Sequence, residues 1–357
     1  PDLTGLIFAG AMWDLRKTFV RTFATAAEGV RAADLLLYAA LQRARDIPSA
    51  YFEILAADDD DGDIANGTPN FCAINEAFGA HGLADPRLSG PPVGAPMLDG
   101  LTVSLPRFER QVDCDAADVV DVRVEWRRRA KTELQGTMSA TESPQGWSAR
   151  LPTPPNNSVV QYRVVIDLDD GTALTFPDNA ADPWYETYVG PTEDLYCIDF
   201  ERNPFAEGWR SELVSGEARE GADDWQWGDT NGGESGDPAT AFSGTNVLGN
   251  DLGEDRFNGA YQADIVNQVT SPPIDTRGFS VVRLQYRRWL NVEDADFDTA
   301  TILANDQPVW SNFATGDNGD THHQDRQWRF HDPTPERGAI HNRCDVSVSR
   351  RRPDWRL

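Results

Sequence analysis

The stretch LIFAGAMWDLRKTFV, residues 6–20, has the apolar spacing of an amphipathic helix. Its apolar side chains recur at helical period on one face, and these are Phe8, Met12, Leu15 and Phe19. The small residues of 9–11 would let another backbone approach closely, although a mid-helix glycine costs about 1 kcal/mol relative to alanine. We expect this helix to cover its apolar face with another part of the protein.

The helical pattern continues through residues 1–86. AEGVRAADLLLYAALQRARD, residues 27–46, keeps the same period, and PSAYFEILAAD, residues 48–58, begins with a proline suited to a first helical turn. For the last helix of this region we expect Thr68 as N-cap, Pro69 at the first helical position and Gly82 as terminator. Residues 1–86 therefore read as a helical domain.

A change of period follows the segment ADPRLSGPPVGAP, residues 84–96, which is rich in proline and glycine. We place a linker at 87–94. Beyond it, LTVSL, DVVDVRVEW and SVVQYRVVIDLDDGTALTF alternate as strands do, the last turning at Asp170 and Gly171. Residues 95–190 are expected to form an Ig-like β-sandwich with a structural role.

Residues 191–332 indicate a larger all-β domain, because GFSVVRLQYRRWL, TATILAND and QWRF are strand-like. In the first of these, Val282, Leu284, Tyr286 and Trp289 are expected to be buried and the intervening arginines exposed. Residues 333–357 turn basic and lose the pattern. They predict an aberrant or disordered tail that adds no strand to close the sheets, the alternative being a tail that binds acidic groups. The expected fold class is multidomain α plus all-β.

Bulk properties limit the partners of this chain of 357 residues. A net charge of -26 disfavours nucleic acid and anionic membranes, which would be repelled. No apolar run approaches the roughly 18 to 20 residues of a membrane span, so no membrane insertion is expected. The 4 cysteines allow two disulfides and require none.

The densest acidic cluster lies in AADDDDGDIANGTPN, residues 56–70. Calcium prefers several oxygen ligands from a flexible loop, which makes this run a candidate calcium site with the ligands Asp58, Asp59, Asp60, Asp61 and Asp63. The loop departs from the EF-hand pattern, because Ala57 stands at the first aspartate position and Thr68 at the glutamate position. A solvated acidic loop is the alternative.

Catalytic motifs are absent from the sequence: it contains neither H-E-x-x-H nor G-x-S-x-G, and none of its 5 histidines has the spacing of a metal ligand beside an acid. We therefore assign no catalytic residue. DDWQWGDTNGGESGDP, residues 223–238, and NVEDADFD, residues 291–298, combine acidic and aromatic side chains. Such loops serve calcium-assisted recognition of glycans or proteins, and tryptophans of the β-domain core are the alternative.

Three stretches carry a family resemblance: GLIFAGAMWDLR, YAALQRARDIPSAYFEILAADDDDGD and NGTPNFCAINEAFGAHGL. In this order they resemble the C-terminal helical half of secreted zinc metallopeptidases of the fungalysin kind, which are gluzincins. YCIDFE and DDWQWG resemble parts of a MAM-type jelly roll.

The resemblance implies a C-terminal fragment of a secreted zinc metalloendopeptidase, with accessory β-domains that bind substrate or a surface. The family's zinc-binding H-E-x-x-H would lie before Pro1, so zinc belongs to the family but is not expected in this chain. Asp2 stands where the family places an oxyanion-binding histidine. We expect an extracellular chain, inactive alone, with protein or glycan partners. The alternative is a secreted non-enzymatic adhesion or binding protein.

Overall fold

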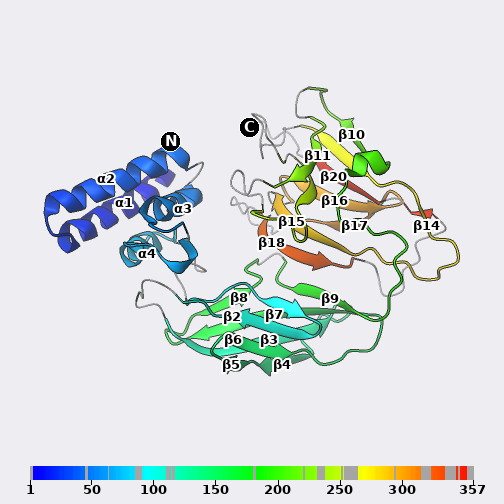
Figure 1. The fold of residues 1–357 in the computed structure, drawn as a ribbon, viewed down its shortest axis with the longest axis horizontal. Helices are drawn as coiled ribbons and strands as arrows, with labels where there is room; N and C mark the ends of the chain where they lie inside the picture. Colours follow the sequence, from blue (N-terminus) through cyan, green and yellow to red (C-terminus); the bar gives the residue numbers. More distant parts are fainter. Residues whose placement is uncertain are drawn as a thin grey trace. The chain divides into compact units, whose positions relative to one another are not determined.

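The structure of the chain is a computed structural model, and it describes residues 3–44, 47–62, 64–84, 91–109, 114, 117–179, 182–219, 222–230, 238–250, 252, 264–292, 295–314, 323–333, 343–344 and 346–351. The chain divides into two compact units. Unit 1 comprises residues 1–124, 137–152 and 164–175, and unit 2 comprises residues 125–136, 153–163 and 176–357. Helices precede antiparallel strands along the chain, so the protein is a mixed α and β protein (Figure 1).

The helical region is confirmed, and its described residues form α1 Leu3–Thr22, α2 Ala26–Arg43, α3 Ile47–Asp58 and α4 Phe71–Gly79. Thr25 is the N-cap of α2: its hydroxyl accepts the backbone N–H of Glu28 at 3.2 Å and donates to the Glu28 carboxylate at 2.9 Å. Helix α1 packs against α2 and α4, and α3 packs against α2 and α4.

The core of the helices contains the apolar face of residues 6–20, which was expected to be covered by another part of the protein. Leu15 and Phe19 are fully buried, and Met12 is only 6% exposed. They pack with residues of α3 and α4, among them Tyr51, Ile54, Phe71, Ile74 and Phe78. The helical region therefore covers this face itself.

Another backbone was expected to approach the small residues 9–11 closely. The close contact between backbones occurs instead at Gly29. A Cβ on Gly29 of α2 would collide with the backbone carbonyl of Phe19, so the two helices touch backbone to backbone here. Gly10 of α1 lies instead against the imidazole of His81.

Residues 97–189 form two sheets. One has the order β1-β2-β6-β5, and the other has the order β4-β3-β7-β8 with β9 also paired to β7. Their bounds are β1 Met97–Asp99, β2 Thr102–Pro106, β3 Val119–Arg128, β4 Gly136–Ser139, β5 Thr141–Ser143, β6 Gly146–Arg150, β7 Ser158–Leu168, β8 Ala173–Phe176 and β9 Tyr185–Val189. The expected turn is confirmed, because Gly171 has a φ of 84° and Asp170 accepts the N–H of Thr172.

The remaining strands pair in four further sheets. A five-stranded sheet has the order β10-β13-β20-β16-β17, and three two-stranded ribbons pair β11 with β12, β14 with β19 and β15 with β18. The bounds are β10 Arg210–Ser215, β11 Trp225–Asp229, β12 Asn246–Asn250, β13 Val266–Thr270, β14 Ile274–Asp275, β15 Tyr286–Val292, β16 Thr299–Ala304, β17 Gln307–Ser311, β18 His323–His331, β19 Arg343–Cys344 and β20 Val346–Arg351.

Two expectations for this region are wrong. β20 pairs with both β13 and β16, so the chain after residue 333 does supply a central strand, whereas residues 334–342 and 352–357 lie outside the described residues. The strand expected from residue 281 begins at Tyr286, and Arg288 is buried instead of exposed. Short polar strands and buried arginines both depend on distant partners, which local alternation does not reveal.

The buried face of α1 sets a stability prediction. Phe19→Ala should lower the free energy of unfolding by about 3–5 kcal/mol, because the ring is fully buried in the helical core. Leu41→Ala is the control, since Leu41 is 69% exposed and its loss should change stability by about 0.5 kcal/mol or less. Denaturant unfolding followed by helical circular dichroism measures both, and equal losses would contradict the described core.

Candidate functional site

The acidic loop brings together three of its five predicted ligands. Carboxylate oxygens of Asp59, Asp60 and Asp61 lie within 4.8 Å of one another. Asp59 also accepts the backbone N–H of Gly62 at 2.7 Å. Asp63 lies outside the described residues. Calcium binding by this loop stays a prediction.

Asp58 has a structural role in the same loop. Its carboxylate accepts the Thr68 hydroxyl at 2.6 Å and the backbone N–H and side-chain amide of Asn70, both at 2.6 Å. The N-cap of α4 is Asn70, so the expectation that Thr68 caps this helix is wrong. Thr68 is fully buried, so its hydroxyl needs a hydrogen-bond partner, which is the Asp58 carboxylate. This bond connects the end of α3 to the segment that precedes α4.

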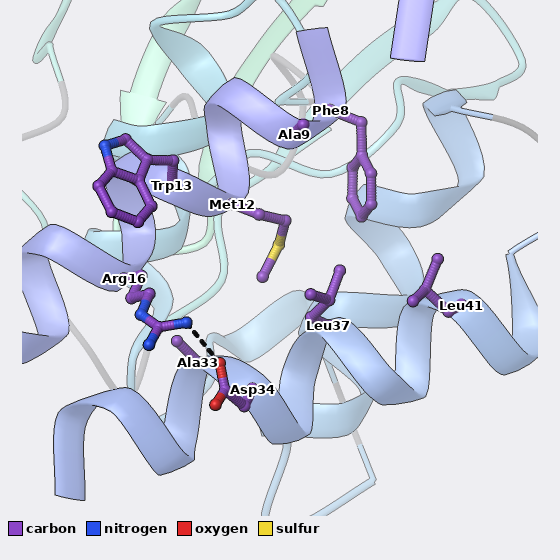
Figure 2. A pocket seen from close by; sticks show the side chains of 9 residues that line it. All are labelled: Phe8, Ala9, Met12, Trp13, Arg16, Ala33, Asp34, Leu37 and Leu41. Carbon is purple, nitrogen blue, oxygen red and sulfur yellow. Dashed lines mark hydrogen bonds and ion pairs between the residues drawn. The ribbon is translucent and has the colours of Figure 1, made fainter. Parts of the chain in front are cut away.

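A groove of about 330 Å³ runs between α1 and α2. Figure 2 shows Phe8 and Met12 of α1 pointing toward Leu37 and Leu41 of α2. Of the residues that line it, Trp13 and Leu41 are exposed. Other large apolar side chains are exposed elsewhere on the two helices: Leu6, Ile7, Leu35 and Tyr38. An ion pair of 2.9 Å between Arg16 and Asp34 also borders the groove (Figure 2). This surface is apolar with few polar groups, which is typical of a packing face.

Unit 2 contains a larger cavity, with a volume of about 890 Å³. Aromatic side chains dominate its wall: Trp209, Trp225, Phe242, Trp289, Trp310 and Trp328. Phe242 is 51% exposed, and Trp289 and Trp328 are half-buried. The volume lies in the range of about 300–1,000 Å³ found for small-molecule sites, and aromatic walls are typical of such sites.

Aromatic side chains surround Arg287, and we call them the aromatic group: Phe242, Trp289 and Trp328 of the cavity wall, together with Phe330, which lies outside the wall. Ring centroids lie 6.1 Å apart for Trp289 and Trp328, and 6.5 Å apart for Phe242 and Trp328. The Arg287 guanidinium lies 4.3 Å from the Phe242 ring centroid and 5.1 Å from that of Phe330. Arg287 of β15 and Phe330 of β18 are cross-strand partners, which places them on one face.

Hydrogen bonds from Glu201 position the loop that carries Phe242. The Glu201 carboxylate accepts the backbone N–H groups of Thr245 and Asn246 at 2.8 and 2.9 Å. These two bonds lower the pKa of Glu201, because they stabilise its ionised form. Trp328 adds a second tie, since its indole N–H donates to the Thr240 carbonyl at 2.9 Å.

The predicted recognition loops contribute only in part. Trp225 lines the cavity, whereas the indole N–H of Trp227 donates to the Phe200 carbonyl at 2.5 Å. Asp223 accepts the Ser211 hydroxyl, and Asp224 accepts the Gln226 amide at 2.5 Å. Residues 231–237 and 293–294 lie outside the described residues. The aspartates next to Trp225 therefore bond to their own loop and strand.

A buried arginine–carboxylate cluster adjoins the cavity, and it comprises Arg129, Arg283, Arg288 and Arg329 with Asp182, Glu186 and Asp332. Arg283 and Arg288 also line the cavity. Arg329 is 1% exposed and donates to the backbone carbonyls of Asp182, at 3.0 Å, and of Trp184. The Asp182 carboxylate lies 3.0 Å from Arg288 and 3.3 Å from Arg329. Buried cations need such partners, because desolvation costs several kcal/mol per ion.

A bidentate pair continues the cluster. Arg283 donates to both carboxylate oxygens of Asp332, at 2.7 and 2.8 Å, and Asp332 is fully buried. The Glu186 carboxylate lies 3.8 Å from both Arg129 and His331, and it accepts the Gln161 amide at 2.9 Å. The cluster thus joins β9 and the residues before it to the β15–β18 ribbon.

Burial shifts two pKa values within the cluster. The pKa of His331 is lowered far below its usual value by burial, and the neighbouring arginine cations lower it further. The pKa of Glu186 is raised by burial, against the attraction of Arg129. His331 is therefore neutral at physiological pH and stacks on the Tyr286 ring at 5.6 Å.

No histidine was assigned a function from the sequence, and the arginine–carboxylate cluster was not predicted. His331 is buried beside the cluster, and His81 of the helical region lies 2.9 Å from Asp14. His322 and His341 lie outside the described residues. The only available signal was the density of arginines in residues 283–288, which the alternation placed on a solvent face.

Stability should depend on pH through His331. The folded pKa of His331 is lowered, so its contribution to stability is present above the unfolded pKa of about 6.5 and is lost as pH falls, by about 1 kcal/mol at pH 5.5. Glu186 acts in the opposite direction, since a raised pKa favours the folded state at low pH.

Comparing the protein with its His331→Gln variant isolates the histidine. Between pH 7.5 and pH 5.5, the free energy of unfolding of the variant should fall by about 1 kcal/mol less than that of the unmodified protein. Denaturant unfolding followed by tryptophan fluorescence measures this, with His81→Gln as the control that retains the dependence. An identical dependence in protein and variant would contradict a neutral buried His331.

None of the helices in the described part of the chain is both long and apolar enough to cross a membrane. No protein-family model and no curated protein sequence matches the chain. Among solved structures, the chain is similar to an α-L-rhamnosidase of Streptomyces avermitilis complexed with L-rhamnose, at 13% identity and a TM-score of 0.15. The match covers 73% of this chain and 22% of the rhamnosidase chain. A TM-score this low shows no common fold.

Proposed function

We propose that this chain is a non-catalytic, carbohydrate-binding part of a secreted protein, with its binding site in the aromatic-lined cavity of unit 2. The observation that carries the proposal is the 890 Å³ cavity, in which Phe242, Trp289 and Trp328 keep exposed surface. A sugar ring has apolar C–H faces and a polar rim of hydroxyls. It fits a wall that offers flat rings beside hydrogen-bond donors.

The disulfide favours the secreted context. Cys72 and Cys114 are joined, with their Cα atoms 5.2 Å apart. Disulfides persist in oxidising compartments and are rare in the cytosol. This pair links α4 to residue 114, which lies within the same unit. It supports the extracellular location that the sequence predicts.

Phe242→Ala tests the binding site. Phe242 is 51% exposed, so its truncation leaves the fold intact while removing an aromatic face from the cavity. Titration calorimetry with neutral and acidic oligosaccharides should detect binding, and the variant should bind about 2- to 10-fold more weakly. Trp13→Ala is the control, because it removes an exposed aromatic from unit 1. Absence of binding to every saccharide, or equal loss in both variants, would contradict the proposal.

A second proposal concerns the helical region. We propose that α1–α4 are scaffold helices of a zinc-metallopeptidase-like protein, as the resemblance of residues 5–16 implies. The exposed apolar surface of α1 and α2 supports this proposal, because helices of an enzyme core pack against further helices on more than one side. The same surface would also suit a degenerate scaffold in an adhesion protein.

The chain should show no zinc-dependent peptidase activity. Casein cleavage by the purified chain should equal the buffer control, with or without added zinc, because the sequence has no H-E-x-x-H. A matched thermolysin-type enzyme serves as the positive control. Cleavage that a chelator abolishes and zinc restores would contradict the non-catalytic role.

A further inference from the structure

Arg287 is the cation of the cavity wall whose charge the described residues leave uncompensated. The other two lining arginines are held by acids, Arg283 by Asp332 and Arg288 by Asp182. In the described part of the chain, Arg287 contacts the rings of Phe242 and Phe330, and no carboxylate lies within ion-pair distance of it. Its side chain is exposed, so its donors remain available to a ligand.

The carboxylates of the cavity wall do not compensate this charge. Glu193, Asp194 and Asp199 also line the cavity, and all three are exposed. Among the described residues no ion pair joins Arg287 to any of them, so none of the three neutralises its charge by direct contact. A guanidinium among aromatic rings binds a planar anion with two parallel hydrogen bonds, a geometry that lysine does not offer.

We infer that the cavity of unit 2 selects an acidic saccharide, whose carboxylate or sulfate binds Arg287 while its sugar face lies on Phe242 and Trp328. This inference rests on the proposed carbohydrate binding and adds its specificity. The aromatic group supplies contact that any sugar shares. Arg287 supplies the preference for the anion.

The experiment compares matched probes by titration calorimetry: a galacturonic acid trisaccharide, its neutral methyl ester, and a sulfated and an unsulfated galactose trisaccharide. The protein should bind an acidic probe at least about tenfold more tightly than its neutral counterpart, and added salt should weaken only the acidic binding. The two acidic probes distinguish carboxylate from sulfate.

Variants assign the preference to Arg287. Arg287→Gln should remove the preference and leave binding of the neutral probes within about threefold, whereas Arg287→Lys should keep part of it. Arg210→Gln is the matched control, because Arg210 is an exposed arginine of β10 outside the cavity wall. Equal binding of acidic and neutral probes by the unmodified protein would overturn the inference while the proposed function stands. Binding of no probe would overturn both.

Discussion

The buried guanidinium of Arg329 is the constraint on which unit 2 depends. A cation at 1% exposure needs polar partners, and Arg329 has the carbonyls of Asp182 and Trp184 together with the Asp182 carboxylate. Those partners lie just before β9, whereas Arg329 lies in β18. Removing one partner would leave a buried charge uncompensated, a loss of about 3–5 kcal/mol. The contacts of Arg329 therefore hold the β15–β18 ribbon against the segment that precedes β9.

The alternation of side chains along β15 and β18 relates the buried cluster to the aromatic group of the cavity. Arg288 and Arg329 are cross-strand partners, and so are Arg287 and Phe330, one position along each strand. Successive side chains point to opposite faces, so fixing the first pair in the cluster orients the second pair away from it. The cluster thus acts as the support of the aromatic group, and it holds Arg287 without neutralising its charge.

Local patterns predicted what local physics determines. The 3.6-residue period of Leu15 and Phe19 indicated α1, and Asp170 with Gly171 indicated the β7–β8 turn, because both depend on neighbours in sequence. The exposure of Arg288 was misjudged because its partner Asp182 lies 106 residues away. Strand β20 was not predicted because its partner strand β13 is also remote in sequence, Val269 pairing with Val348. The cavity itself was not predicted. Of the aromatic residues in the predicted recognition loops Trp225 lines it, and the other rings of the wall come together by folding.

Net charge and local charge answer different questions about partners. The net charge of -26 repels a long polyanion, because such a partner would contact the acidic surface over many Debye lengths. A saccharide presents one or a few charges and meets only the wall around it. Physiological salt leaves charges about 8–10 Å apart only partly screened. At this range the group that decides the binding of a small anion is Arg287, which lies between two aromatic rings. An acidic protein can therefore repel nucleic acid and still select a small anion, because the selection is made inside one screening length.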